Sequence, residues 1–412
     1  MNTYRSCIQY CIASIFGLLL FLGMSACNEQ SPIAGGDLYS DTINVDILTS
    51  DSIPMFGGIS ILNSKPAASY PLDLFLGSAK GYESSILARF GNVPDSLGDA
   101  QIISAQLILQ PKRYALGDSL SNRIAFDVFS ILKPWTPRAT IDTFLQAGFL
   151  ETMPQGTFDG SIALRDTMPT ISVSISQSLI QSWFALKQKA KTDSTINTES
   201  AYAIALKPKV GSAVIRAFAR YRYDSVQKTN VNAVLIRVLY KKSGSTTIDT
   251  MTLESAYEGS FTTEPPAPSG KMIVNCGTGS YSGLECSLKQ LPTGIAIHGA
   301  VLKLTLDTAL SIRGNVTRDS SISAQFVDST AGNLIREFSG EVKSDITVYE
   351  FPVMNALVES LLRNTRTGTL KIFPSIQKDR IRLDRLVFHG PNDPDPKKRP
   401  SLRIVYSTRP KP

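Results

Sequence analysis

The sequence contains very little histidine and tryptophan. Its 412 residues include two histidines, His298 and His389, and only two tryptophans. Histidine is the usual general base near neutral pH and a common metal ligand. Its scarcity disfavours most metal-dependent and base-catalysed chemistry. We therefore predict a protein that is not an enzyme, with no catalytic residues, no metal site and no cofactor.

One short segment could suggest the opposite. "LGDSL" at 116–120 resembles the block that carries the nucleophilic serine in a family of esterases. Such a serine needs a histidine base, which usually arrives in an Asp-x-x-His arrangement. The residues three positions before His298 and His389 are isoleucine and leucine. We interpret the Gly-Asp step of this block as a turn between two strands.

Long basic runs are also missing, although the net charge is +7 and the pI about 9.0. Such a mild charge favours anionic partners without choosing among them, and we predict no nucleic-acid partner. The acidic residues Asp393 and Asp395 lie in "PNDPDPKKRP", where the prolines interrupt any regular calcium loop. A solvated surface loop is the simpler interpretation of that segment.

The N-terminus has the proportions of an export signal. A polar start with Arg5 is followed by a mostly apolar run that is short for a membrane span. "GMSAC" resembles the lipobox of bacterial lipoproteins, which implies a signal peptide at 1–26, acylation of Cys27 and a polar tether at 27–41. The resemblance implies a lipid bilayer as partner and a place at the bacterial outer membrane or cell surface. An ordinary signal peptide or an anchor helix is the alternative.

The rest of the chain repeats itself. "LIRVLYK" (235–241) matches "SLRIVYS" (401–407), "AIALKP" (203–208) matches "TLKIFP" (369–374), and "ISAQLIL" (103–109) matches "HGAVLKL" (298–304). "ILARFGNVP" (86–94) matches "LECSLKQLP" (284–292), and the openings "TIN" and "TID" also agree. Matches in the same order indicate two copies of one domain, 42–242 and 247–408.

Within each copy the apolar residues mostly alternate. Ile236, Val238 and Tyr240 share one face, as do Leu107 and Leu109. Alternation interrupted by turn residues is typical of half-buried antiparallel strands. We predict an all-β protein made of two tandem jelly-roll-like β-sandwich domains. Each domain should carry one short helix, formed by "SLIQSW" (178–183) in the first copy and "ALVESL" (356–361) in the second.

The order of these segments resembles the DNRLRE-domain family, which is related to the family 96 carbohydrate-binding modules. "ILARFGNVP", "ISAQLIL", "FSILKPWTP", "LIQSWF", "AIALKP" and "VLIRVLY" carry the resemblance in the first copy. In the second copy Leu361 replaces the helix tryptophan and nothing matches Trp135. The resemblance implies the sandwich fold in both copies and puts a shared ligand in doubt.

Two cysteines, Cys276 and Cys286, remain once the N-terminal segment is set aside. We place both on inward positions of neighbouring antiparallel strands, where a disulfide could form in an exported protein. Two buried thiols without a disulfide are the alternative, and the sequence leaves both open.

The candidate ligand site is a pair of strand faces rich in arginine and tyrosine. "VIRAFARYRYD" (214–224) and "KDRIRLDRLVF" (378–388) are equivalent segments of the two copies. Arginine pairs with carboxylates and sulfates, and tyrosine stacks on sugar rings. A solvated strand face is the alternative. The predicted site residues are Arg216, Arg220, Arg222, Tyr221, Tyr223, Arg380 and Arg382.

These features predict a membrane-anchored, non-catalytic binding protein of the bacterial cell envelope, with polysaccharide, and acidic polysaccharide in particular, as the expected ligand. The competing hypothesis is a structural or adhesive surface lipoprotein that binds an envelope protein.

Overall fold

The computed structural model describes residues 44–408 apart from short internal gaps. The gaps are 64, 119, 165–169, 197, 199–200, 225–227, 316–321, 329–331, 333, 343–346 and 375–379. The predicted signal peptide, the tether and Cys27 lie outside the described residues. No helix of the described part is long and apolar enough to cross a bilayer.

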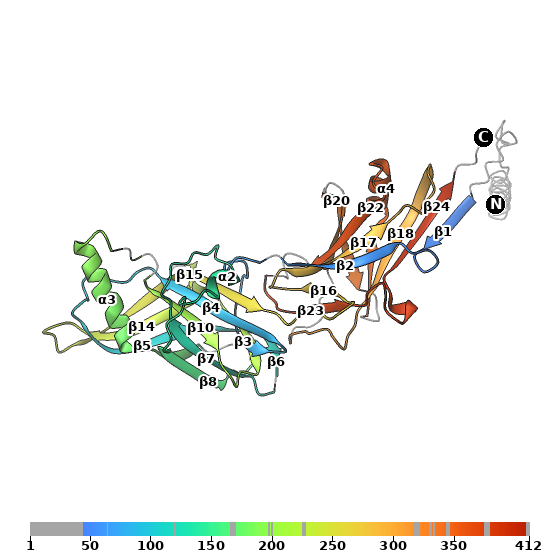
Figure 1. Ribbon diagram of the computed structural model, residues 1–412. Helices are drawn as coiled ribbons and strands as arrows, with labels where there is room; N and C mark the ends of the chain where they lie inside the picture. The colour runs from blue at the N-terminus through green and yellow to red at the C-terminus, as the bar shows by residue number, and fades with distance from the viewer. Residues whose placement is uncertain are drawn as a thin grey trace, which may run out of the picture.

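Antiparallel sheets dominate the described chain and confirm the all-β prediction. They form two sandwich-like units that lie end to end (Figure 1). We call residues 65–263 the middle unit, and residues 44–63 together with 264–408 the terminal unit. Each unit encloses its own apolar core.

The middle unit contains two sheets. One has the order β15 (Ile248–Thr263), β14 (Leu235–Lys241), β5 (Gln101–Leu109) and β9 (Ile171–Ser174). The other has the order β6 (Pro111–Gly117), β11 (Val214–Phe218), β3 (Leu74–Ala79), β4 (Tyr82–Phe90), β10 (Ala203–Pro208), β7 (Arg123–Ser130) and β8 (Gly156–Ser161). The second half of β15 crosses over to pair with β4. A separate hairpin joins β12 (Tyr221–Asp224) and β13 (Thr229–Asn232).

The terminal unit repeats this arrangement. One sheet has the order β1 (Asn44–Thr49), β24 (Ser401–Thr408), β18 (Ile295–Thr305) and β21 (Val348–Pro352). The other has the order β23 (Arg385–Phe388), β16 (Met272–Asn275), β17 (Ser280–Ser287), β22 (Thr367–Pro374), β19 (Ile322–Asp328) and β20 (Leu334–Val342). The strand β2 (Phe56–Asn63) pairs with β17.

Alternating burial explains why these segments are strands. In β22 the buried residues are Gly368, Leu370, Ile372 and Pro374, and the residues between them are half-exposed. Successive strand side chains point to opposite faces, so one face of β22 enters the core. The same alternation in the first copy places Ile204 and Leu206 in the core of the middle unit.

Both predicted helices are present. The helix α3 (Gln177–Thr192) buries Leu179, Ile180, Trp183 and Phe184 against the middle core and is longer than expected. The helix α4 (Met354–Leu362) takes the same place between β21 and β22. A short helix, α2 (Ile141–Phe144), and the 3-10 turn η3 (Pro396–Lys398) were not predicted.

Membership of the units differs from the predicted boundaries at 42–242 and 247–408. The strands β1 and β2 belong to the first sequence copy but pair with β24 and β17 of the second. The strand β15 belongs to the second copy but pairs with β14 and β4 of the first. Two short crossing segments, 65–73 and 264–271, therefore connect the units.

The units meet through a small core of their own. Phe75, Tyr82, Tyr114 and Ile215 of the middle unit pack with Leu383 of the terminal unit. The Tyr114 hydroxyl accepts a hydrogen bond from the Leu383 amide (2.9 Å) and donates one to the Asp384 carboxylate (3.0 Å). Because buried polar groups that are paired fix relative orientation, this contact holds the two sandwiches together.

Candidate functional site

The predicted arginine face does not form a surface groove. Arg216 is fully buried, and its Nη1 and Nη2 donate to the carbonyl oxygens of Ile162 (2.5 Å) and Lys112 (2.9 Å). Burial lowers the pKa of this guanidinium to about 10. A guanidinium enclosed in this way stabilises the sandwich and cannot meet a polysaccharide.

Arg220 and Arg380 both donate hydrogen bonds to the crossing segment 65–73. Arg220 is nearly buried and donates from Nη1 to the Ser69 carbonyl (3.3 Å). Arg380 donates from Nε to the Tyr70 carbonyl (2.6 Å), and its guanidinium lies 5.4 Å from the centre of the Tyr70 ring. The structure thus brings these two predicted residues together, where both hydrogen-bond to the backbone of the crossing segment.

The other predicted residues are dispersed. The Tyr221 side chain is exposed on the β12–β13 hairpin, and Arg382 is half-buried just before β23. The side chains of Arg222 and Tyr223 lie outside the described residues. Alternation failed as a guide because β11 ends at Phe218, so Arg220 is no longer on the strand that carries Arg216.

Cys276 and Cys286 are both buried and are not joined by a disulfide. Val274 of β16 faces Tyr281 of β17, and Cys276 lies on the turn side of that pair. Cys286 lies five residues beyond Tyr281 in the other direction, roughly 17 Å along the strand. Disulfides need Cα atoms within about 7 Å, so the hairpin separates these thiols too far. Of the two alternatives, the structure has the buried thiols.

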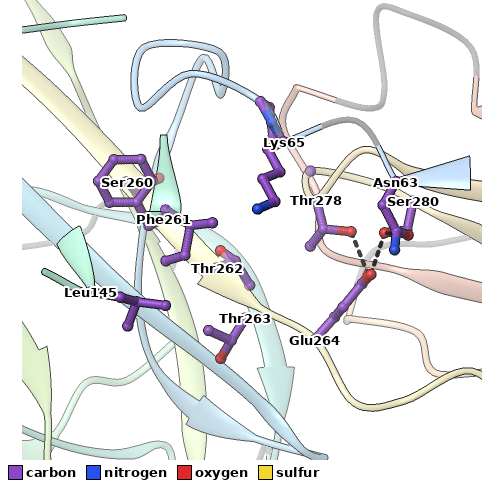
Figure 2. A pocket seen from close by; sticks show the side chains of 13 residues that line it. Asn63, Lys65, Leu145, Ser260, Phe261, Thr262, Thr263, Glu264, Thr278 and Ser280 are labelled. Carbon is purple, nitrogen blue, oxygen red and sulfur yellow. Dashed lines mark hydrogen bonds between the residues drawn. The ribbon is translucent and has the colours of Figure 1, made fainter. Parts of the chain in front are cut away.

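A polar pocket lies where the two units meet, and sequence reasoning missed it (Figure 2). Its volume is about 280 Å³. Four segments line it: the start of the first crossing, the end of β15, the loop after α2 and the β16–β17 turn. The lining residues are Asn63, Lys65, Pro66, Ile141, Leu145, Ser260, Phe261, Thr262, Thr263, Glu264, Gly277, Thr278 and Ser280.

Glu264 organises the polar side of the pocket. Its carboxylate accepts hydrogen bonds from the hydroxyls of Thr278 (2.7 Å) and Ser280 and from the amide of Asn275. Figure 2 shows the Thr278 and Ser280 side chains converging on this carboxylate. The same Ser280 hydroxyl oxygen lies 2.8 Å from Asn63 Oδ1. A carboxylate can accept about four hydrogen bonds, so Glu264 retains accepting capacity toward the pocket.

The opposite side combines apolar surface with one cation. Leu145 is 65% exposed and Phe261 lies nearby at the wall. The Lys65 ammonium pairs with the Asp142 carboxylate at 2.7 Å, and both side chains are more than half exposed. The buried Ser260 hydroxyl has no hydrogen-bond partner among the described residues. The pocket therefore offers an apolar wall beside fixed hydroxyl, amide and carboxylate groups.

A sequence signal for this pocket existed. Glu264 begins "EPPAPSG", a proline-rich segment directly after a strand. Such a segment marks a connection between structural units, where ligand pockets are frequent. The pairing partners of β2 and β15 were needed to show which residues meet Glu264 there.

Comparisons with known proteins return little. No family model matches the chain, and no curated protein matches it. Among solved structures, the infectious bursal disease virus VP2 subviral particle is 10% identical with a TM-score of 0.16, covering 90% of this chain and 77% of that one. A Macrobrachium rosenbergii nodavirus structure is 9% identical with a TM-score of 0.11 and covers 92% of each chain. Likeness this weak supports no argument about function.

Proposed function

We propose that this chain is a non-catalytic, polysaccharide-binding lipoprotein of the bacterial cell envelope, with two jelly-roll domains that arose by duplication. The junction pocket carries the proposal. Sugars present an apolar ring face beside a rim of hydroxyls, and the pocket pairs Leu145 and Phe261 with the Glu264 carboxylate and its hydroxyl neighbours. Its size suits one sugar unit of a longer chain.

The burial of Arg216 changes which polysaccharide is favoured. An acidic polymer was expected because of the arginines, but the Arg216 guanidinium already donates to two carbonyl groups. The pocket carries one carboxylate, Glu264, and one lysine that is paired with Asp142. We therefore expect neutral sugars to bind at least as well as acidic ones.

The proposal is tested by a glycan array on the mature chain, followed by affinity measurements on variants. Leu145→Ala and Glu264→Gln should each weaken binding about ten-fold, because each removes roughly one contact of about 1.4 kcal/mol. Glu337→Gln, an exposed change on β20 outside the pocket, is the matched control. Unchanged affinity in both pocket variants, or an array without any hit, would refute the assignment.

The competing role, a structural or adhesive spacer that binds an envelope protein, has one observation in its favour. The contact of Tyr114 with Leu383 and Asp384 holds the units in a fixed orientation. A spacer needs such stiffness, whereas a binding protein does not. Small-angle scattering on Tyr114→Phe separates the roles: a spacer would lose its fixed length, with no change in glycan affinity.

A further inference from the structure

We infer that the two copies of the domain have exchanged their first strands within one chain. The exchange is seen by comparing equivalent strands. In the middle unit β14 pairs with β5 on one side and with β15 on the other. In the terminal unit the matching strand β24 pairs with β18 on one side and with β1 on the other. In each unit, one neighbour of the matching strand therefore comes from the other sequence copy: β15 beside β14, and β1 beside β24.

The opposite sheets repeat this relation. In the middle unit β4 pairs with β3, β10 and the second half of β15. In the terminal unit the matching strand β17 pairs with β16, β22 and β2. The segment β1–β2 thus occupies in the terminal unit the place that β15 occupies in the middle unit. Without exchange, β1–β2 would pair with β14 and β4, and β15 with β24 and β17.

Equivalent residues of the two copies face the two exchanged strands. Ile59 of β2 faces Leu284 of β17, and Ser260 of β15 faces Ile86 of β4. Leu284 and Ile86 are the matching positions of the two sequence copies. Because side chains alternate between faces, agreement in register means that both exchanged strands present corresponding faces to their cores. Exchange of an identical element between two copies of a domain is a low-cost rearrangement.

The exchange determines where the ends of the chain lie. Asn44 faces Thr408 across β1 and β24, so both ends of the described chain are at the same end of the terminal unit (Figure 1). The middle unit, a continuous segment from 65 to 263, lies at the opposite end. On the proposed lipid anchor, the middle unit would be presented away from the membrane. That consequence depends on the anchor, whereas the exchange itself does not.

The exchange also builds the junction pocket. Lys65 and Pro66 begin the first crossing, directly after Asn63 at the end of β2, and Glu264 begins the second, directly after Thr263 at the end of β15. The two crossings therefore form walls of one cavity. Without the exchange, the ends of β2 and β15 would pair with other strands and would not line one cavity.

Disulfide trapping in the full-length chain tests the exchange without any ligand. Leu62 faces Tyr281, and Thr263 faces Glu83. All four positions are exposed or half-exposed, so cysteine should be tolerated there. Leu62→Cys with Tyr281→Cys, and Thr263→Cys with Glu83→Cys, should cross-link under mild oxidation, because paired Cα atoms lie about 4.5–5.5 Å apart.

The crossed pairs are the matched controls. Leu62→Cys with Glu83→Cys, and Thr263→Cys with Tyr281→Cys, should stay reduced in chains whose tryptophan fluorescence is native. Non-reducing peptide mass spectrometry reads out the links, and the mass of the intact chain shows that they lie within one molecule. Cross-linking of the crossed pairs, no link in the facing pairs, or a dimer mass would each overturn the exchange. None of these outcomes depends on glycan binding.

Discussion

The two units carry the same ion pair with its charges reversed. In the middle unit Asp73, the residue before β3, pairs with Lys112 at 2.5 Å. In the terminal unit Lys271, the residue before β16, pairs with Asp307 at 3.1 Å. Lys112 and Asp307 occupy equivalent positions in the two units. Lys112 follows Pro111, which faces Phe218 of β11, and Asp307 follows Leu306, which faces Phe388 of β23. Both units place an ion pair at this position, with the acidic and basic residues interchanged.

The surroundings of the two pairs differ. Lys112 is about half exposed, and burial raises the pKa of Asp73 although Lys112 opposes the shift. In the terminal unit Lys271 also bonds Asp393 at 2.9 Å, and His389 Nδ1 lies 2.7 Å from that carboxylate. Hydrogen bonds from Lys271 and His389 lower the pKa of Asp393. The pair of the middle unit corresponds to a partly buried network in the terminal unit, which ties the loop after β23 to the sheet.

The largest expected effect comes from exchanging the core residues Arg216 and Leu386, which occupy equivalent positions on β11 and β23. Leu386→Arg should destabilise the terminal unit by about 4 kcal/mol or more, because it places a charge among apolar side chains. Arg216→Leu should cost about 1–3 kcal/mol, since two carbonyls lose their donor. Urea unfolding measures both.

Leu386→Met is the control for that experiment and should cost less than about 1.5 kcal/mol. If Arg216→Leu proved more damaging than Leu386→Arg, the equivalence of the two cores would have to be abandoned.

The ion pairs give the next largest difference. Lys271→Met leaves Asp307 and Asp393 without their shared cation in a partly buried site, so we expect a loss of about 2 kcal/mol, between the values for exposed and buried pairs. Lys112→Met removes a half-exposed partner and should cost about 1 kcal/mol or less. Thermal unfolding of the two variants compares the two losses of stability. Equal losses would show that Asp393 and His389 add no stability to the Lys271–Asp307 pair.

Acid should act on the two ion-pair sites in opposite directions. The pKa values of Asp393 and Asp307 are lowered; for Asp307, burial opposes the shift and the Lys271 hydrogen bond and charge prevail. Their stabilisation is present above the unfolded pKa of about 4 and is lost as pH falls through the folded values. The raised pKa of Asp73 means that its contribution is present below about pH 4 and is lost as pH rises.

As pH falls below about 4, the Lys271 network should therefore weaken while the Asp73–Lys112 site does not. Trp135 and Trp183 both lie in the middle unit and report on it alone, while hydrogen exchange on 264–408 reports on the other. The variant Asp393→Asn should reduce the pH dependence of the terminal unit. An unchanged pH dependence of the terminal unit in Asp393→Asn would contradict the prediction.

Sequence reasoning found many of the strands because alternation of apolar residues is a local pattern. The alternation in "TLKIFP" and the helix in "SLIQSW" need only neighbours in the chain, and both are present as expected. The exchange of β1–β2 with β15 was out of reach, because the two copies present equivalent faces and either pairing satisfies the alternation. The prediction that Arg216 is a surface ligand residue was wrong for a related reason. Alternation places Arg216 on one face of β11 but does not say which face is buried.

The smallest expected effect concerns Cys286, which faces Gly368 on β22 and occupies the place of Ala88 in the matching segments. Burial raises the pKa of its thiol to about 12. Since the thiolate is the reactive form, the native chain should resist alkylation at Cys286 near pH 8 and react once unfolded. Cys286→Ala should change stability by less than about 1.5 kcal/mol, because a small apolar residue fits the equivalent strand. Rapid native alkylation, or a non-reduced mass lower by two hydrogens, would show that the thiol is not enclosed as described.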